Sequence, residues 1–470
     1  MKYIHSILIL LGLFYYQIAT SQSKAIEGAW QGELLIQGQP LTIIININKQ
    51  SDDSYKGTFD SPDQKAFGVP FTEVTFANNI LNCGISKMLL FVSGELMPND
   101  SLKLLWQQGP AVFPLTLGRI KGENRSVKRP QEPQGVLPYQ VKEVSFVNKI
   151  DQIKLKGTLT IPQGKGPFPA VVLVSGSGPQ NRNSAVFDHQ PFLVLSDFLT
   201  RHGIAVLRYD DRGTGESEGV FKTATSIDFA NDANAAFNFL SHQNGIDKNK
   251  VGIAGHSEGG MIAPMVATQN KKVSFVVMIA GPALPIDSLM YEQIRLTMEA
   301  SHTPEMDIQN QLIFNHQLFN YLKAMPTYDK ADAGLDSFIK QVVIGQMGID
   351  TNGLFVALAA QAKQLHSVVT PWFHYFINYQ PKSNLGYLKM PVLGLYGGKD
   401  LQVRALSNAS VLQTILEKSK NKVFKVYTFP NLNHLMQTAT TGSIEEYNEI
   451  TETFNEAAMQ MIADWILTLK

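Results

Sequence analysis

The sequence predicts a small antiparallel β-domain followed by an α/β domain, which is built on a mostly parallel eight-stranded sheet with a helical insertion. Short runs of alternating apolar and polar residues fill the first part of the chain. From about residue 141, buried strands alternate with amphipathic helices. Between residues 280 and 389 the pattern is helical without a convincing strand, too long for an ordinary connection. The chain of 470 residues has room for both domains.

Residues 1–21 are predicted to form a secretory signal peptide. Lys2 precedes an apolar run over residues 4–18, and the small residues Ala19 and Ser21 come directly before the expected cleavage position near Ser21-Gln22. The alternative is an uncleaved membrane anchor, but the run is shorter than the ~20 apolar residues of a spanning helix. No span is expected after cleavage. We therefore expect an exported bacterial protein, either periplasmic or secreted.

Charge and cysteine content exclude several classes of function. Lys+Arg and Asp+Glu number 40 each, so no net field attracts nucleic acid. Cys83 is the only cysteine, which excludes an intramolecular disulfide and a thiolate metal cluster. No H-E-x-x-H motif suggests a metal, and Gly213-Thr214-Gly215 lacks the lysine of a phosphate-binding loop. We expect no metal, no cofactor and no nucleic-acid partner.

Residues 22–120 are predicted to form the N-terminal β-domain. Apolar and polar residues alternate over residues 41–47, and similar short runs recur at residues 89–91, 102–106 and 112–117. Gly, Asn, Asp and Ser clusters separate the runs, as is typical of a small barrel or half-barrel. Trp30 and Trp106 are expected in its core, with a ligand cavity as the alternative.

The α/β domain, residues 137–470, follows a charged, proline-containing linker at residues 121–136. Its strands are predicted at residues 141–147, 153–161, 170–174, 204–209, 251–254, 273–279, 391–396 and 423–429. Helices are predicted at residues 192–202, 227–242, 260–269 and 406–418. Buried strands that are each followed by a helix indicate a sheet covered on both faces, with its site beyond the carboxyl ends of the strands. The insertion, residues 283–388, is predicted to form a helical cap.

A G-x-S-x-G motif joins the strand at 251–254 to the following helix. It reads Gly255-His256-Ser257-Glu258-Gly259. A sharp strand-to-helix turn strains the serine backbone, and the glycines two residues to either side leave room for it. The motif therefore predicts a nucleophile elbow at Ser257, with an ordinary structural turn as the alternative.

Ser257 needs a base to take its proton and an acid to orient that base. Asp400 follows the strand at 391–396, and His434 follows the last strand, at 423–429. The order Ser257, Asp400, His434 is that of the α/β-hydrolase triad. Asp188, Asp210 and Asp211 compete for the role of the acid, and His189, His256, His366 and His374 for that of the base. We favour Asp400 and His434 because each follows a strand in the required order.

The oxyanion of an acyl-transfer reaction needs two hydrogen-bond donors. One is expected from the backbone N–H of Glu258, the residue after the nucleophile. The other is expected from the small-residue loop after the strand at 170–174, where Ser177 is the preferred amide.

Four segments together resemble the bacterial α/β-hydrolase esterases of the EstD type. They are the elbow, S-G-S-G-P-Q-N-R-N at 175–183, D-D-R-G-T-G-E-S at 210–217, and G-G-K-D-L-Q-V at 397–403. These esterases are similar to serine aminopeptidase-like and prolyl oligopeptidase-like hydrolases, and some carry a comparable β-domain. The resemblance covers residues 137–470 and implies hydrolysis of small-molecule carboxylic esters of short acyl chains through an acyl-enzyme. Asn181 departs from the acidic residue expected there, which affects the contacts of that loop.

Two other functions stay open from the sequence. An aminopeptidase-like enzyme acting on short peptides would need an acidic cluster in the cap, for which Glu292, Glu299, Glu305 and Asp307 are candidates. An envelope binding protein would use the hydrolase domain only as a scaffold. The aromatic residues at 371–376 either wall an acyl pocket or pack against one another.

Overall fold

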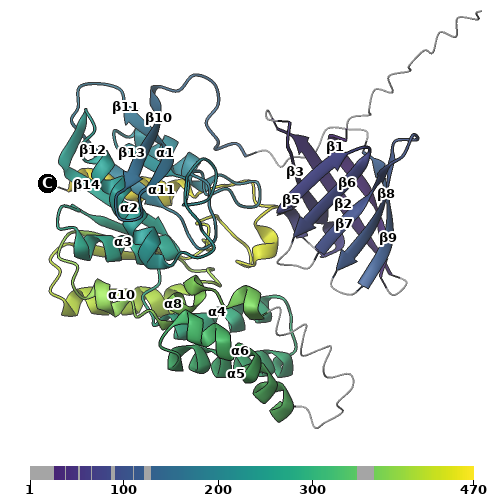
Figure 1. Cartoon of the computed structure of the whole chain (residues 1–470). Coiled ribbons are helices and arrows are strands. Elements are labelled where there is room, and N and C mark those ends of the chain that lie inside the picture. Colours follow the sequence, from purple (N-terminus) through teal and green to yellow (C-terminus); the bar gives the residue numbers. More distant parts are fainter. Residues whose placement is uncertain are drawn as a thin grey trace, which may run out of the picture. The chain divides into compact units, whose positions relative to one another are not determined.

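The chain is represented by a computed structural model that describes residues 26–36, 39–50, 53–64, 66–85, 90–108, 111–120, 129–346 and 365–469. It divides into two compact units, residues 1–124 and residues 125–470 (Figure 1). The predicted signal peptide and residues 121–128 of the predicted linker lie outside the described residues. Within those ranges no helix combines the length and the hydropathy needed to cross a membrane.

The first unit is an antiparallel sheet of nine strands in the order β4-β3-β2-β1-β9-β8-β7-β6-β5. The strands are β1 Gly28–Ile36, β2 Gln39–Lys49, β3 Tyr55–Ser61, β4 Ala66–Pro70, β5 Glu73–Ala77, β6 Ile80–Ile85, β7 Leu90–Leu96, β8 Ser101–Gln108 and β9 Ala111–Arg119. Two meanders meet where β1 pairs with β9. Because β3 also contacts β5, the sheet curls toward closure, as the barrel-like outline in Figure 1 shows.

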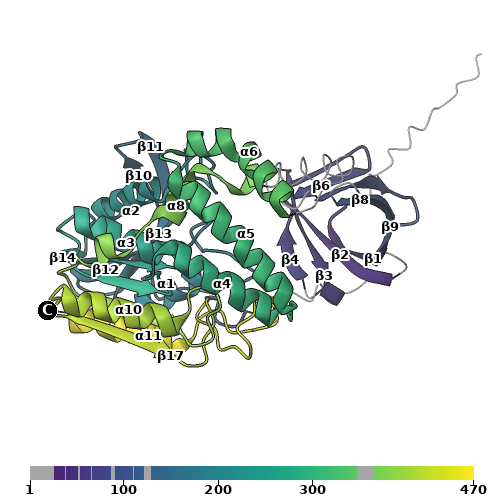
Figure 2. The ribbon, with the colours of Figure 1, turned by 90° about the horizontal axis from the view of Figure 1, so that it is seen from below.

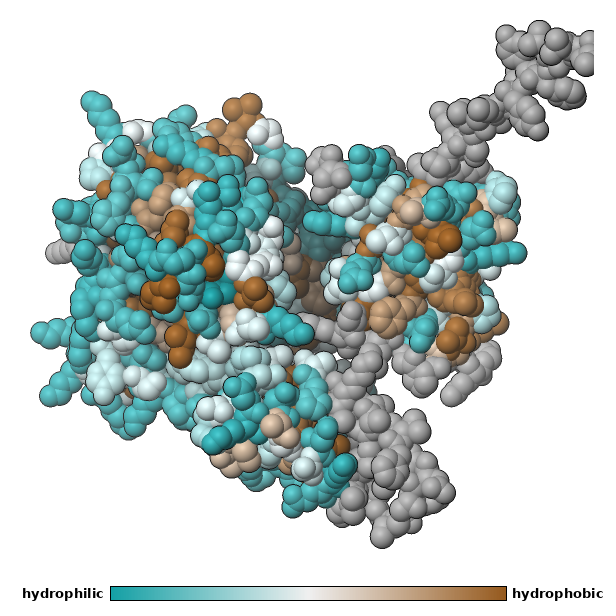
Figure 3. Space-filling model, viewed as in Figure 1, coloured by the Kyte–Doolittle hydropathy of each residue, from teal (hydrophilic) through white to brown (hydrophobic). Residues whose placement is uncertain are grey.

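The inner face of this sheet is a hydrophobic core. Trp30, Ile45 and Trp106 are buried there, so the prediction that the two tryptophans are core residues is confirmed. Leu105 and Val112 point outward instead, because side chains alternate between the two faces of a strand. Figure 3 shows hydrophobic residues gathered on the outer surface of this unit, between hydrophilic ones.

The second unit is built on a sheet of eight strands in the order β10-β11-β13-β12-β14-β15-β16-β17. The strands are β10 Tyr139–Asn148, β11 Ile153–Pro162, β12 Phe168–Val174, β13 Ala205–Tyr209, β14 Ile246–His256, β15 Val276–Ile279, β16 Val392–Gly397 and β17 Phe424–Phe429. β10 and β11 form an antiparallel hairpin, β11 pairs antiparallel with β13, and all later pairs are parallel. This is the mostly parallel sheet that the sequence predicts.

Helices cover both faces of the second sheet. Helices α1 Pro191–Arg201 and α11 Glu456–Thr468 pack on one face, where Val171 and Leu173 of β12 join their core. Helices α2 Ser226–Leu240, α3 Glu258–Gln269 and α10 Ala405–Lys418 pack on the other. Helix α11 is absent from the sequence prediction, although Ala458, Ile462 and Ile466 recur at helical spacing and are buried.

The predicted cap is helical over the residues that the structure describes. Its helices are α4 Ile286–Ala300, α5 Glu305–Ala324, α6 Tyr328–Gln346, α8 Pro371–Asn378 and α9 Lys382–Leu385. Helix α5 packs between α4 and α6, as Figure 2 shows. Leu318, Phe319 and Phe373 bury the contact between α5 and α8. The cap therefore has its own apolar packing and is continuous with the core of the sheet.

The described part of the predicted linker is fixed to the second unit. Arg129 is buried, and its guanidinium donates to the carbonyl oxygens of Phe187 and Asn448, each at 3.0 Å. The side chain of Gln131 accepts from the backbone N–H of Thr453 at 2.6 Å and donates to the Phe454 carbonyl at 2.7 Å. These polar groups are satisfied by backbone, so residues 129–131 are an ordered part of this unit.

Candidate active site

Ser257 occupies a strained turn between β14 and α3. Its φ is 54° and its ψ is −119°, in a region that residues with a side chain rarely adopt. A Cβ atom at Gly255 would lie 1.9 Å from the carbonyl oxygen of Gly259, and one at Gly259 would lie 2.1 Å from that of Val174. Both positions therefore require glycine, which is what the elbow motif predicts.

Asp400 and His434 form a buried hydrogen-bonded pair. The Asp400 Oδ2 atom lies 2.8 Å from Nδ1 of His434, and both side chains are almost fully buried. The other oxygen of Asp400 accepts from the backbone N–H groups of Gln402 and Val403, each at 2.8 Å. Because an ionised carboxylate only accepts hydrogen bonds, Nδ1 of His434 carries a hydrogen and Nε2 of the neutral ring is left as the basic nitrogen.

The predicted site residues meet at one cavity of about 360 Å³. Ser177, Ser257, Glu258 and His434 all line it, and Asp400 lies behind His434. Its further lining comes from loops of the sheet and from the cap: Gly176, Gln180, Ser184, Val186, Phe187, His256, Pro282, Leu289, Met290, Gln293, Trp372, Phe376, Gln402, Val403, Leu435, Ile444 and Tyr447. The structure thus brings together the five residues that the sequence singles out, three for their side chains and two for their backbone amides, while their catalytic roles stay predictions.

His256, the neighbour of Ser257, holds the loop that carries His434. Its Nε2 atom donates to the backbone carbonyl of His434 at 2.8 Å, and the centroids of the two imidazole rings are 4.8 Å apart. Loss of solvent around the ring, and then the nearby His434, lower the pKa of His256 to about 4. A neutral, donating imidazole suits a positioning role better than that of the base.

The other competing histidines have structural partners elsewhere. His189 is buried with its ring nitrogens 2.9 Å from Thr453 Oγ1 and 2.8 Å from the Tyr447 carbonyl, and burial lowers its pKa to about 4. His366 pairs with Asp332 and Asp336 of α6, and His374 contacts the carbonyl of Met325 in the cap. None of these three is among the described residues that line the cavity.

Asp210 and Asp211 brace the small-residue loop after β12, as the sequence indicates. Asp211 accepts from Ser175 Oγ and from the Gln180 backbone N–H, each at 2.9 Å. Asp210 accepts from the backbone N–H of Arg182 at 2.7 Å and pairs with its guanidinium at 2.6 Å. Burial raises the pKa of Asp211 to about 8. The loop with Ser177 is therefore held at both ends.

Asn181, the departure from the resemblance, stabilises the same loop locally. Its side-chain oxygen accepts from the backbone N–H groups of Asn183 at 3.0 Å and Ala185 at 3.3 Å. An Asx-type turn of this kind orders the chain without a charge. The amide at this position thus contributes to the backbone geometry of the loop rather than to the cavity.

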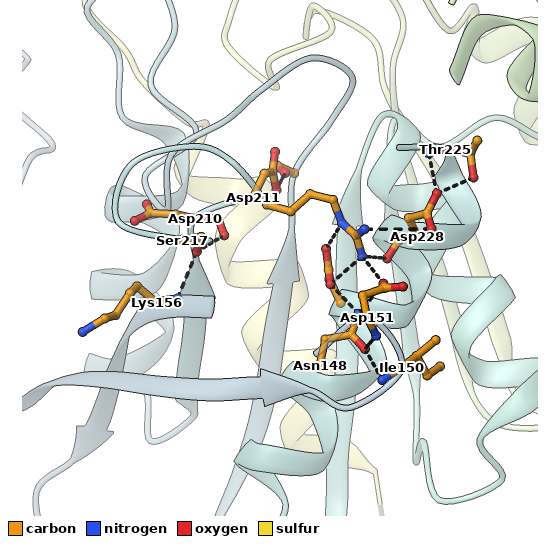
Figure 4. A network of polar contacts seen from close by, with 12 residues as sticks. Asn148, Ile150, Asp151, Lys156, Asp210, Asp211, Ser217, Thr225 and Asp228 are labelled. Carbon is orange, nitrogen blue, oxygen red and sulfur yellow. Dashed lines mark hydrogen bonds and ion pairs between the residues drawn. The ribbon is translucent and has the colours of Figure 1, made fainter. Parts of the chain in front are cut away.

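Arg212 anchors the D-D-R-G-T-G-E-S segment to the body of the unit through Asp151 and the Asp228 carbonyl, two residues of the polar network labelled in Figure 4. It is buried and binds both oxygens of buried Asp232, at 2.7 and 2.9 Å, as well as Asp151 at 2.7 Å. Ser217 donates to the Asp210 carbonyl at 2.7 Å. A Cβ at Gly215 would lie 2.6 Å from the Asp210 carboxyl group, so this glycine allows a close approach. This network supports the loop instead of cradling a phosphate.

The side chain of Glu258 is a feature that sequence reasoning missed. It is 2% exposed and accepts from Ser226 Oγ at 2.6 Å and from Trp372 Nε1 at 2.8 Å. Burial raises the pKa of Glu258, and hydrogen bonds from Ser226, Trp372 and Ser177 oppose that rise. The only signal in the sequence was an acidic residue in an apolar turn, where a carboxylate needs donors.

The cap supplies an apolar wall. Trp372 and Phe376 line the cavity with their rings stacked 4.8 Å apart, and Phe373 instead packs inside the cap on Phe319. The stretch at 371–376 therefore both walls the cavity and packs internally. Apolar side chains of α4, Leu289 and Met290, extend the wall.

The acidic candidates for binding a peptide amine lie elsewhere. Glu292 accepts from Ser407 at 2.6 Å, and Glu299 and Glu305 form surface ion pairs with Arg295. Neither these three nor Asp307 is among the described residues that line the cavity. Over the described ranges, no three His, Cys, Asp or Glu side chains are grouped so as to hold a metal ion.

Comparison with known proteins agrees with the resemblance indicated by the motifs. The chain is 29% identical over 301 residues to esterase EstD of Thermotoga maritima, a match that spans 64% of this chain and 62% of the length of that relative. It is also 30% identical over 141 residues to thiohydrolase aneE of Aspergillus aculeatus, covering 29% of this chain and 40% of that one. The resemblance to esterases of the EstD type is thus confirmed.

A family model and solved structures add two further likenesses. Residues 151–322 match the model of the X-Pro dipeptidyl-peptidase (S15 family). An esterase of Pyrococcus furiosus aligns with 74% of this chain and 99% of its own at 15% identity and a TM-score of 0.42. A 2,6-dihydroxy-pseudo-oxynicotine hydrolase aligns with 70% of this chain and 68% of its own at 18% identity and a TM-score of 0.40.

Proposed function

We propose that the chain is a serine hydrolase that cleaves small-molecule carboxylic esters through an acyl-enzyme intermediate. One observation carries the proposal: Ser257, strained on its elbow, lines the same cavity as His434, whose Nδ1 is held 2.8 Å from a buried carboxylate. A histidine held by a carboxylate in this way is the kind of base that a serine hydroxyl, otherwise a weak nucleophile, needs for activation. The similarity to esterase EstD supports the same activity.

In the proposed mechanism, Ser257 attacks the ester carbonyl carbon while His434 takes the hydroxyl proton on Nε2. Asp400 keeps the imidazole oriented and stabilises the positive charge that it gains. The backbone N–H groups of Glu258 and Ser177 are proposed to hold the oxyanion. His434 then gives its proton to the departing alcohol, and a water molecule activated by the same histidine releases the acid and restores Ser257.

A short acyl chain is the proposed preference. The cavity of about 360 Å³ lies near the lower end of typical ligand sites, and Leu289, Met290, Trp372 and Phe376 offer it an apolar wall. Its described lining includes one carboxyl side chain, Glu258, which is already hydrogen bonded, and no Lys or Arg. Uncharged substrates fit this surface best.

Peptide hydrolysis is the second candidate, because residues 151–322 match the dipeptidyl-peptidase family model. Against it, none of the four acidic residues considered for binding a terminal amine is among the described residues lining the cavity. An amide also needs better-placed acid catalysis than an ester, since amines are poorer leaving groups.

The deciding experiment is a matched panel of p-nitrophenyl acyl esters and aminoacyl or dipeptidyl p-nitroanilides, assayed with the protein and its Ser257→Ala variant. We expect short esters to be turned over by the protein and not by the variant. Preferential cleavage of anilides would overturn the ester proposal in favour of a peptidase. Absence of both activities and of labelling by a fluorophosphonate would favour a binding protein with an inert hydrolase scaffold.

Export to the periplasm or the medium also stands as a proposal, supported by the residue pattern of the first 21 positions. N-terminal sequencing of the protein recovered from its native cells tests it. A start near residue 22 is expected, and an intact Met1 in a cytosolic fraction would overturn it.

A further inference from the structure

Two polar side chains in the lining of the cavity have no part in the proposed catalysis. Gln402 and Tyr447 both line it, and both are neutral groups. The apolar wall of the cap is tied to the elbow, since Trp372 donates to the Glu258 carboxylate at 2.8 Å. Gln402 is instead tied to the triad, because its backbone N–H donates to Asp400 at 2.8 Å. The apolar wall and the polar pair are therefore anchored to different parts of the site.

Tyr447 is held by contacts of its ring, its backbone and its hydroxyl group. The residue is 2% exposed, and its ring packs edge-on against Phe187 at a centroid distance of 5.6 Å. Its carbonyl oxygen lies 2.8 Å from Nε2 of His189. The side-chain amide of Gln402 donates to its hydroxyl oxygen at 3.2 Å. Gln402 and Tyr447 thus form a pair that is in place before a substrate binds.

The pair keeps one donor and one acceptor for a ligand. Among the described residues, no acceptor is hydrogen bonded to the hydroxyl proton of Tyr447, and no donor to the Oε1 atom of Gln402. Burial raises the pKa of Tyr447, so the phenol keeps that proton. A hydroxyl group both donates and accepts, so it can satisfy the two atoms together. An apolar group would leave them unpaired, which disfavours it as a ligand.

The contacts of the pair also indicate which half of an ester it meets. In the proposed mechanism, the oxygen of the departing alcohol must come within hydrogen-bond distance of Nε2 of His434. The other nitrogen of that ring is held by Asp400, and Gln402 is bonded through its backbone to the same carboxylate. The pair is therefore connected to the part of the triad that the alcohol approaches.

We propose that Gln402 and Tyr447 form a subsite for a hydroxyl group of the leaving alcohol, so that the substrates are short acyl esters of polyols or sugars. This inference rests on the proposed ester hydrolysis and adds the class of alcohol to it. The bond between the acyl carbon and the alcohol oxygen breaks, and one water molecule supplies the hydroxyl group of the acid and the hydrogen of the alcohol. The products are a short carboxylic acid and the free polyol.

A pair of matched esters tests the subsite. Glyceryl 1-acetate and propyl acetate share the acyl group and the length of the alcohol, and differ only in the hydroxyl groups of the glycerol. We expect the kcat/KM of the protein to be about tenfold higher for the glyceryl ester, as one or two neutral hydrogen bonds allow. Tyr447→Phe keeps the ring and removes the donor. It should lower the ratio of the two kcat/KM values about fivefold, mainly by raising KM for the glyceryl ester.

The ratio separates binding of the hydroxyl group from a structural effect of the substitution. A disturbed loop would slow both esters alike and leave their ratio unchanged. Tyr387→Phe, at an exposed tyrosine that does not line the cavity, is the control and should keep the ratio and both rates within about twofold of the parent. Equal kcat/KM values for the two esters in the parent, or a ratio that survives Tyr447→Phe, would overturn the subsite and leave ester hydrolysis standing.

A binding measurement does not depend on turnover. In the Ser257→Ala background, ligand-observed NMR should show glyceryl 1-acetate binding about fivefold more weakly when Tyr447→Phe is added. A parent that hydrolyses neither ester and resists fluorophosphonate labelling would refute the proposed ester hydrolysis. The same weakening of binding would then still support the hydroxyl subsite, and unchanged binding would overturn the subsite as well.

Discussion

The two units of the chain bury very different kinds of side chain. In the described part of the first unit, the buried residues are apolar apart from Ser61. The second unit buries a series of ionisable and amide groups, and among them Glu258 and His434 line the cavity, with Asp400 behind His434. Burying such groups is costly unless each is hydrogen bonded, so their concentration at one edge of a sheet marks a site where chemistry requires them.

The difference also separates two ways of holding a fold together. The first unit depends on apolar area on the inner face of a curled sheet. Around its site, the second unit depends in addition on hydrogen-bonded charges, such as Arg212 with Asp232 and the carboxylate of Glu258 with its donors. Substitutions of the same type should therefore have unequal effects in the two units.

The largest expected effect is on catalysis. Asp400→Asn should lower kcat by about 10⁴-fold, because an amide in place of the carboxylate favours the wrong tautomer of His434. Asp188→Asn, an exposed competitor for the acid role, is the matched control and should lose less than about twofold. Steady-state kinetics on p-nitrophenyl acetate measures both. Equal losses in the two variants would remove Asp400 from the triad.

The next effect is on stability. Arg212→Met should destabilise the second unit by about 3–5 kcal/mol, because it leaves buried Asp232 without its cation. The same change in the first unit, Arg119→Met, removes a partly exposed pair with Asp100 and a cation–π contact with Trp30, and should cost about 1 kcal/mol. Urea titration followed by segment-resolved hydrogen exchange separates the units. A larger cost for Arg119→Met would contradict the comparison.

Acid should weaken the second unit through its buried neutral histidines. The pKa of His189 is about 4 in the folded state and about 6.5 when unfolded, so below pH 6.5 the unfolded chain takes up a proton that the folded chain does not. Stability contributed by His189 is thus present above pH 6.5 and lost as the pH falls toward 4. At pH 5 the loss from His189 is about 2 kcal/mol.

Denaturation at pH 7.5, 6 and 5 measures this slope, and His189→Gln should flatten it. His256 adds to the slope in the same direction, since its pKa is also about 4. The first unit has no histidine beyond His5, so its transition should lack this dependence. A parallel acid slope in both units would count against the assignment to these histidines.

The smallest difference compares two fully buried serines. Ser226→Ala removes a donor to the Glu258 carboxylate and should destabilise its unit by about 1.5–3 kcal/mol. The hydroxyl group of Ser61 has no hydrogen-bond partner among the described residues, so Ser61→Ala should change stability by less than about 0.5 kcal/mol. Segment-resolved exchange again measures each. Similar costs at the two positions would mean that Ser61 has a partner such as water.

Local patterns in the sequence were enough for most of the fold and for the triad candidates. The β10–β11 hairpin, the strand before Ser257 and the cap helices follow from hydrophobic periodicity and glycine positions, which act over a few residues. Helix α11 was missed, because no strand or motif after His434 drew attention to an amphipathic stretch near the end of the chain. The hydrogen bonds of Arg129 to the carbonyl groups of residues 187 and 448 could not be predicted either, since they join segments that are distant in the sequence.

By itself, the sequence determined the elbow glycines, the order Ser257, Asp400, His434 and the change from alternating strands to strand–helix units. Each of these can be recognised from short stretches of sequence and from their order along the chain. Only the tertiary structure decided that His256 holds the His434 loop, that Asp211 fixes the ends of the loop with Ser177, and that Trp372 of the cap shares the Glu258 carboxylate. These contacts bridge up to 178 positions of chain. Burial and hydrogen bonding among distant side chains select them, and no local pattern carries that information.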